Sequence, residues 1–111
     1  MATPSLALGI KPEIVRISLD AKGDIRCEPD IFRVSKGKKP NVCVVWVCDQ
    51  PFSVDFGSKE NSPFYESHFT ESETCSGLVR RDVPASGEEK VYKYTVRVGG
   101  KKLDPGGKVD P

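Results

Sequence analysis

Histidine and cysteine are the residue types in this chain that could bind a transition metal or supply a nucleophile. His68 and Cys75 are the only such pair that lies close together in the sequence. With a carboxylate such as Glu71 or Glu73 they could ligate a metal ion, and an imidazole beside a thiol could activate that thiol as a nucleophile. No C-x-x-C or H-x-x-x-H spacing supports a metal site, however. We therefore predict no catalytic residues, no bound cofactor and no enzymatic activity. A metal or thiol redox site at His68 and the cysteines is the alternative.

The chain has four cysteines, at Cys27, Cys43, Cys48 and Cys75. The sequence predicts that Cys43 and Cys48 lie on one strand, where five residues span about 16 Å. A disulfide needs Cα atoms within about 7 Å, so these two are not expected to pair, and their odd spacing sends them to opposite faces. Buried free thiols are the expectation for both. A Cys27–Cys75 disulfide in a secreted or periplasmic domain stays open as an alternative.

Aromatic side chains stand out in the polar stretch at residues 57–74, where Phe64, Tyr65 and Phe69 surround His68. Exposed aromatic residues anchor protein interfaces because they bury a large area with few rotatable bonds. Long loops without regular structure are also often functional. These four residues are therefore our interaction candidates. The alternative is that the loop folds back and packs its aromatic rings over the end of the domain.

The elements that must position these residues are short strands with alternating polarity. The clearest runs from Lys90 to Val98, where Tyr92, Tyr94, Val96 and Val98 occupy alternate positions and predict one buried face. Further strands are expected at residues 13–19, 25–27, 31–34, 42–48, 52–56 and 75–79, with a final edge strand around Val109. We find no amphipathic segment long enough to predict a helix of ten or more residues.

Seven to eight short strands separated by turn residues predict an all-β fold, a Greek-key β-sandwich. The length of 111 residues fits one compact domain. We expect a flexible leader at residues 1–12 and a single domain at residues 13–111.

Four segments in this region carry a further signal. They are Phe32-x-Val34-x-x-Gly37, Val42-x-Val44-x-Trp46, Gln50-Pro51-Phe52-Ser53-Val54-x-Phe56 and Tyr92-x-Tyr94-Thr95-Val96. Their order and spacing resemble the cupredoxin family of blue-copper proteins, in which a histidine follows the third segment's proline and a cysteine ends the last segment. The resemblance implies a cupredoxin-like sandwich.

The copper ligands of that family have no counterparts here. The first histidine position falls at Phe52 and the cysteine position at Val96, and no histidine or methionine follows Val96. A type-1 copper centre needs two imidazoles and one thiolate, whereas the chain has a single histidine. We therefore predict a cupredoxin-like domain without a type-1 copper site.

Charge and hydropathy restrict the class of partner. The chain has 17 basic and 16 acidic residues, a net charge of +1, which does not favour nucleic acid or an anionic membrane as the partner. No apolar run approaches the roughly 20 residues that span a bilayer. The first ten residues lack a basic region and a long apolar run, which predicts a cytoplasmic protein. A periplasmic or secreted location is the alternative if a signal peptide has been removed.

These observations together predict a non-enzymatic β-sandwich that acts as a binding or assembly module. The partner is expected to be a protein, bound by the 57–74 segment or by an exposed sheet edge that pairs with another chain. The sequence does not identify that partner.

Overall fold

The chain is described by a computed structural model that covers residues 11–36, 41–83 and 91–110, and this part is all-β. It contains ten strands and one short 3-10 turn, η1, at Lys59–Asn61. The predicted leader at residues 1–12 falls almost wholly outside the described residues. In the part of the chain that the structure covers, no helix is long and apolar enough to cross a membrane.

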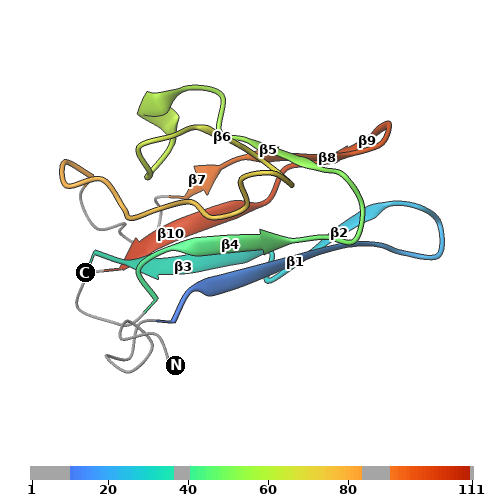
Figure 1. Cartoon of the computed structure of the whole chain (residues 1–111), viewed down its shortest axis with the longest axis horizontal. Coiled ribbons are helices and arrows are strands. Elements are labelled where there is room, and N and C mark those ends of the chain that lie inside the picture. The colour runs from blue at the N-terminus through green and yellow to red at the C-terminus, as the bar shows by residue number, and fades with distance from the viewer. Residues whose placement is uncertain (1–10, 37–40, 84–90, 111) are drawn as a thin grey trace.

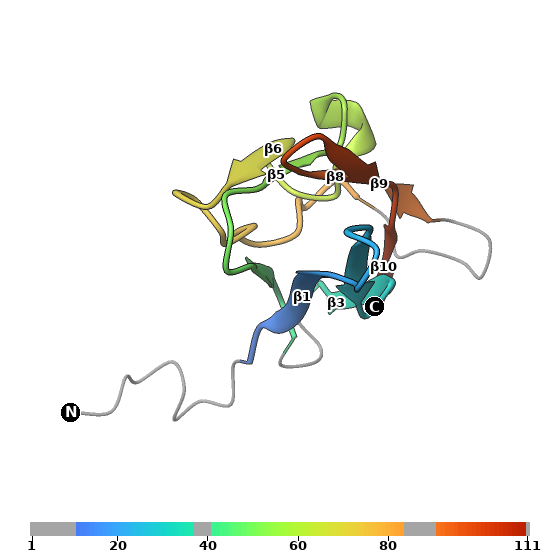
Figure 2. The same ribbon diagram turned by 90° about the vertical axis from the view of Figure 1, so that its right-hand side faces the viewer.

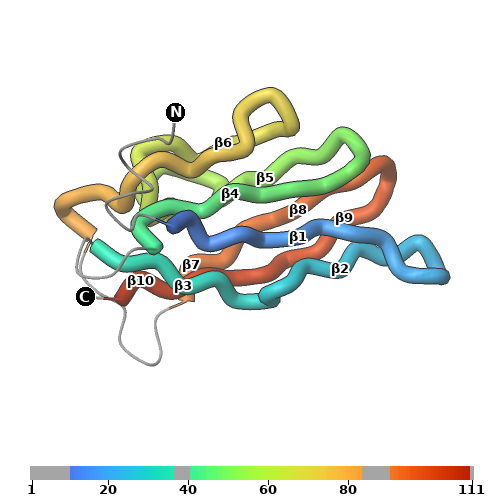
Figure 3. The backbone as a smooth tube through the Cα atoms, turned by 60° about the horizontal axis from the view of Figure 1, so that its bottom comes forward, coloured from blue at the N-terminus to red at the C-terminus, as the bar shows by residue number. Residues whose placement is uncertain are grey.

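The first sheet is built around β1 (Glu13–Leu19), which lies between β2 (Ile25–Glu28) and β4 (Val44–Val47) (Figure 3). β1 pairs with β2 in antiparallel register and with β4 in parallel register. The turn between β1 and β2 is closed by Asp20, whose carboxylate accepts hydrogen bonds from the backbone N–H groups of Lys22 and Asp24. Gly23 has a φ of +83° in this turn, a conformation that favours glycine.

The second sheet has the order β3 (Ile31–Ser35), β10 (Gly106–Asp110) and β7 (Tyr92–Lys93). The third has the order β6 (His68–Thr70), β5 (Ser53–Asp55), β8 (Thr95–Val98) and β9 (Lys101–Leu103). Figures 1 and 2 show this four-stranded sheet as one layer, with β1, β3 and β10 in the layer that faces it. The arrangement is compatible with a β-sandwich.

The predicted strand at residues 90–98 differs from the structure in one respect. The chain forms two strands, β7 and β8, which belong to different sheets and meet at Tyr94. The predicted alternation is nevertheless confirmed, because Tyr92, Tyr94, Val96 and Val98 are all buried. Tyr94 donates its backbone N–H to Pro105, so the residue at the crossing remains paired. Side-chain periodicity thus continues through a change of sheet.

The prediction of an edge strand around Val109 is wrong. β10 lies between β3, with which it is parallel, and β7, with which it is antiparallel. Its glycines explain how it fits there, because Gly107 stands opposite Phe32 and the Phe32 ring occupies the space that a Cβ at Gly107 would need. Gly106 is crowded in the same way by Val91. The glycine-rich sequence near the end of the chain, which resembles a loop, therefore forms the central strand β10, whose backbone packs against the Phe32 ring.

The buried apolar side chains form one contiguous cluster between the layers. Its centre is Trp46, which is fully buried and lies against the rings of five other aromatic residues at centroid distances of 5.1–6.4 Å. Its indole N–H donates to the Tyr94 hydroxyl at 3.3 Å, which gives both buried polar groups a partner. The five rings belong to Phe32, Phe56, Phe64, Phe69 and Tyr94.

Candidate functional site

The 57–74 segment is not a detached loop. It contains η1 and β6, and a local turn fixes its middle: the Ser62 hydroxyl donates to the Glu66 carbonyl at 2.7 Å and accepts from the Phe64 N–H at 3.1 Å. Pro63 is fully buried beside it. This turn directs Phe64 into the core while Tyr65 turns outward.

Two of the four interaction candidates therefore lie where no partner reaches them. Phe64 is 0% exposed and Phe69 is 2% exposed, and their rings pack against Trp46 at centroid distances of 6.4 and 5.1 Å. The structure adopts the alternative in which the segment folds back over the core. The physical reason is the hydrophobic effect, because a buried phenyl ring gains about 1.5–3 kcal/mol over an exposed one. Phe64 and Phe69 are corrected here from surface candidates to core residues.

Tyr65 and Leu78 form an exposed apolar pair that sequence reasoning found only in part. An isolated antiparallel bridge joins Phe64 to Val79, and its register places Tyr65 opposite Leu78 on the outer side of the same two segments. Tyr65 is 55% exposed and Leu78 is 61% exposed. The Arg81 N–H donates to the Tyr65 hydroxyl at 3.4 Å. Leu78 was not among the candidates from the sequence. The strand expected at residues 75–79 was a signal for it, because consecutive strand residues such as Leu78 and Val79 point to opposite faces, so one of the two must face outward.

His68 lies on β6 in register with Asp55 of β5. Its Nδ1 is 3.9 Å from an Asp55 carboxylate oxygen, and both side chains are solvent-exposed, so this contact contributes little to stability. Cys75, by contrast, interacts with Cys43. Within residues 11–36, 41–83 and 91–110 no group of three or more His, Cys, Asp or Glu side chains is close enough to hold a metal ion. The alternative of a metal site at His68 and Cys75 therefore has no set of three such side chains to support it among the described residues.

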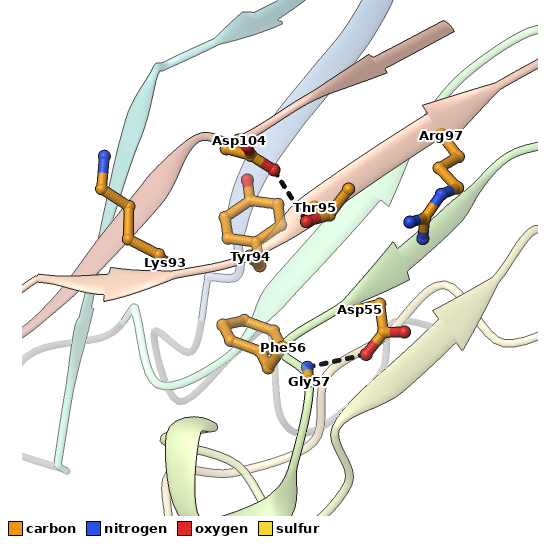
Figure 4. A pocket seen from close by; sticks show the side chains of 8 residues that line it. All are labelled: Asp55, Phe56, Gly57, Lys93, Tyr94, Thr95, Arg97 and Asp104. Carbon is orange, nitrogen blue, oxygen red and sulfur yellow. Dashed lines mark hydrogen bonds between the residues drawn. The ribbon is translucent and has the colours of Figure 1, made fainter. Parts of the chain in front are cut away.

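A hollow of about 600 Å³ lies beside β5 and β8 (Figure 4). Two of its acidic groups are already engaged: Asp104 accepts from the Thr95 hydroxyl, and Asp55 accepts from the Gly57 N–H, each at 2.7 Å. Lys93 and Arg97 also line it. Its volume is within the usual range for ligand sites, but such sites are mostly apolar, whereas four of the eight residues that line this hollow are charged. The hollow is a polar surface feature without a defined chemistry.

The cysteines lie on two faces of the first sheet. Cys27 is 5% exposed and belongs to the core cluster, with Cys48 packed against the same cluster. Cys75 is exposed, and its bridge to Val45 places it on the other face. The possible Cys27–Cys75 disulfide is therefore wrong for this structure, because the sheet separates the two thiols. The predicted placement of Cys43 and Cys48 on opposite faces is confirmed.

Cys43 and Cys48 are half-buried, so the expectation that both are buried thiols is wrong. The pKa values of Cys27 and Cys43 follow from their positions. Burial raises the pKa of Cys27 to about 12, and the nearby Asp30 and Cys48 add to this by repelling a thiolate. Burial also raises the pKa of Cys43 to about 11, with Cys75 contributing both charge repulsion and a side-chain hydrogen bond. Both groups are thus neutral thiols at neutral pH.

The positions that correspond to copper ligands in the cupredoxin resemblance are core positions. Phe52 is 5% exposed, and Val96 is fully buried in register with Val54. Neither offers a side chain that binds a metal.

Comparison of the chain with protein-family models, with curated proteins and with solved structures found no match. The residues themselves are therefore the basis for a functional proposal.

Proposed function

We propose that this chain is a non-enzymatic binding module, a cupredoxin-like Greek-key β-sandwich that binds another protein through Tyr65 and Leu78. The observation that carries the proposal is the exposure of these two side chains, at 55% and 61%, on the two segments that the Phe64–Val79 bridge joins. Isolated exposed apolar residues are ordinary on protein surfaces, but Tyr65 and Leu78 each follow or precede a member of the Phe64–Val79 bridge, so the register of that bridge brings the two exposed residues to the same part of the surface.

The packing and hydrogen bonding of the two segments that carry Tyr65 and Leu78 favour their use as a binding surface. Phe64 and Val79, which form the bridge, are packed into or against the core, and the Arg80 N–H donates to the Pro63 carbonyl at 2.8 Å. Tyr65 and Leu78 are therefore held in place before any partner arrives. A surface that is already ordered loses less conformational entropy on binding, which improves affinity.

The charges around the pair suit a partner surface of mixed character. Arg81 and Asp82 follow closely on Leu78 and are exposed, so a polar rim lies beside the apolar contact. A cytoplasmic location belongs to the same proposal. It is supported by four cysteines that are all free thiols, as is usual in reducing compartments.

The test compares which proteins are captured by three forms of the purified chain: the wild type, a control variant and a variant of the proposed surface. The wild type and an Ile31→Ser control, whose substituted residue is 44% exposed on β3, should retain the same proteins. A Tyr65→Ser/Leu78→Ser variant should lose them, with a fall in affinity of tenfold or more, because aromatic anchors dominate interface energies. Equal capture by the double variant and the wild type, with both folded by circular dichroism, would show that this surface is not the binding site.

A further inference from the structure

Residues 74–76 run alongside β4, on the edge of the strand that is not paired with β1. Val45 and Cys75 form an antiparallel bridge. The Ser76 N–H donates to the Val44 carbonyl and the Ser76 hydroxyl accepts from the Val44 N–H, each at 2.8 Å, while the Trp46 N–H donates to the Thr74 carbonyl at 3.1 Å. The residues before and after Cys75 are thus both hydrogen-bonded to β4, which holds Cys75 beside the strand.

This docking brings Cys75 to Cys43. Cys43 immediately precedes β4 and lies two residues before Val45, so the alternation of the strand, continued by one residue, puts it on the side of Val45 and diagonally across from Cys75. The two thiols are close enough for Cys75 to help raise the pKa of Cys43. Cys75 is exposed and Cys43 is half-buried, which makes Cys75 the more accessible of the two thiols to a reagent.

We propose that Cys43 and Cys75 are a redox pair that forms a reversible disulfide by exchange with a low-molecular-weight disulfide such as oxidised glutathione. The inference is independent of the Tyr65–Leu78 surface, because it requires no partner protein.

The exchange takes place in two balanced steps. The Cys75 thiolate attacks one sulfur of the small disulfide; a Cys75 mixed disulfide forms, and one small thiol leaves with the proton that Cys75 gave up. The Cys43 thiolate, a minor form because the pKa of Cys43 is raised to about 11, then attacks the Cys75 sulfur, so this second step is the slower one. The Cys43–Cys75 bond forms, and the second small thiol leaves with the proton from Cys43. The protein loses two hydrogens and two electrons, and one molecule of the small disulfide is reduced to two thiols.

The diagonal placement makes this disulfide easy to reduce. Diagonal neighbours in a regular antiparallel pair have Cα atoms about 7–8 Å apart, whereas a disulfide needs at most about 7 Å. Closure therefore draws the segment of Cys75 slightly toward β4. Strained and exposed disulfides have more oxidising potentials than structural ones, which is the property of a regulatory bond.

The test uses the full chain in glutathione buffers of increasing oxidised fraction at mildly alkaline pH. Remaining thiols are trapped by alkylation in denaturant, and the products are identified by intact mass and peptide mapping. We expect a species that is two hydrogens lighter, a cross-linked peptide joining Cys43 to Cys75, and alkylated Cys27 and Cys48. A dithiol reductant should return the original mass.

Three variants make the result specific. Cys75→Ser should remove the cross-link, Cys43→Ser should leave a persistent glutathione adduct at Cys75, and Cys48→Ala should behave as the wild type. A persistent adduct at Cys75 of the wild type, a cross-link to Cys27 or Cys48, or no oxidation at all would overturn the proposal. If a variant fails to fold, peptide mapping of the wild type alone decides between these outcomes.

Discussion

The cysteine side chains of this protein differ mainly in which face of the first sheet they occupy. Cys27 lies in the core and Cys75 lies outside, and only the second meets solvent. The thiolate is the reactive form of cysteine, so burial suppresses the chemistry of Cys27. At the scale of single residues, position on a face decides whether a thiol packs or reacts.

The raised pKa of Cys27 predicts a loss of stability at alkaline pH. An unfolded chain loses the proton of this thiol from about pH 9, whereas the folded state keeps it until about pH 12, so the unfolded state binds fewer protons as pH rises. The free energy of unfolding should fall by about 1 kcal/mol per pH unit above pH 9 from this group. Burial also raises the pKa of Tyr94, which extends the fall.

Urea unfolding between pH 7 and pH 10.5 measures this effect. The Cys27→Ala variant should be less stable at pH 7 but should lose stability less steeply above pH 9. A Cys75→Ser variant, which changes an exposed thiol, should keep most of the wild-type slope. Identical slopes for wild type and Cys27→Ala would contradict the assignment of this effect to the buried thiol.

At the scale of elements, the strands are short and depend on their neighbours for their place. β7 and β8 follow each other in the chain with one residue between them, yet they belong to two sheets. β10 lies at the centre of its sheet because its two glycines leave room for Phe32 and Val91. Close approach of the backbone to a neighbouring side chain, the Phe32 ring at Gly107 and Val91 at Gly106, is the role of these glycines, rather than turn formation.

We predict that Gly107→Ala destabilises the protein by about 1–3 kcal/mol, the usual range for an overpacked core. The added Cβ overlaps with the buried Phe32 ring, which has no free space to move into. Gly100→Ala is the matched control, because nothing lies within 4 Å of its added Cβ. Glycine to alanine at such a site is neutral or slightly stabilising through the unfolded state. Denaturant midpoints of the two variants should therefore move in different directions, and a Gly107→Ala protein as stable as wild type would contradict this packing.

At the scale of the whole molecule, the aromatic cluster around Trp46 unites the layers. Phe32 from β3 contacts Trp46 from β4, and Phe64 and Phe69 come from the segment that the sequence suggested as a loop. That segment is therefore part of the cooperative core and should unfold together with the sheets.

Adjacent substitutions at Phe64 and Tyr65 test this view. Phe64→Ala should cost about 3–5 kcal/mol, as for other fully buried phenylalanines. Tyr65→Ala should cost less than about 1 kcal/mol, because its side chain is largely exposed. Unfolding monitored by Trp46 fluorescence and by circular dichroism should coincide for both variants. Equal costs for the two substitutions would mean that the 57–74 segment does not belong to the core.

Local patterns in the sequence determined a large share of this fold. Alternation predicted β1, β3, β5 and the buried face of residues 92–98, because a strand with one buried face must repeat every two residues. A nearly all-apolar run predicted β4, and the turn residues that flank β2 predicted that strand. It also placed Cys43 and Cys48 on opposite faces.

Tertiary structure alone decided which segments become neighbours. The central position of β10, the change of sheet at Tyr94, the burial of Phe64 and Phe69, the Tyr65–Leu78 pair and the Cys43–Cys75 contact all join residues that are distant in sequence or that follow no period. The physical reason is that periodicity records which side of a strand is buried, whereas pairing depends on how the layers fill the space around Trp46.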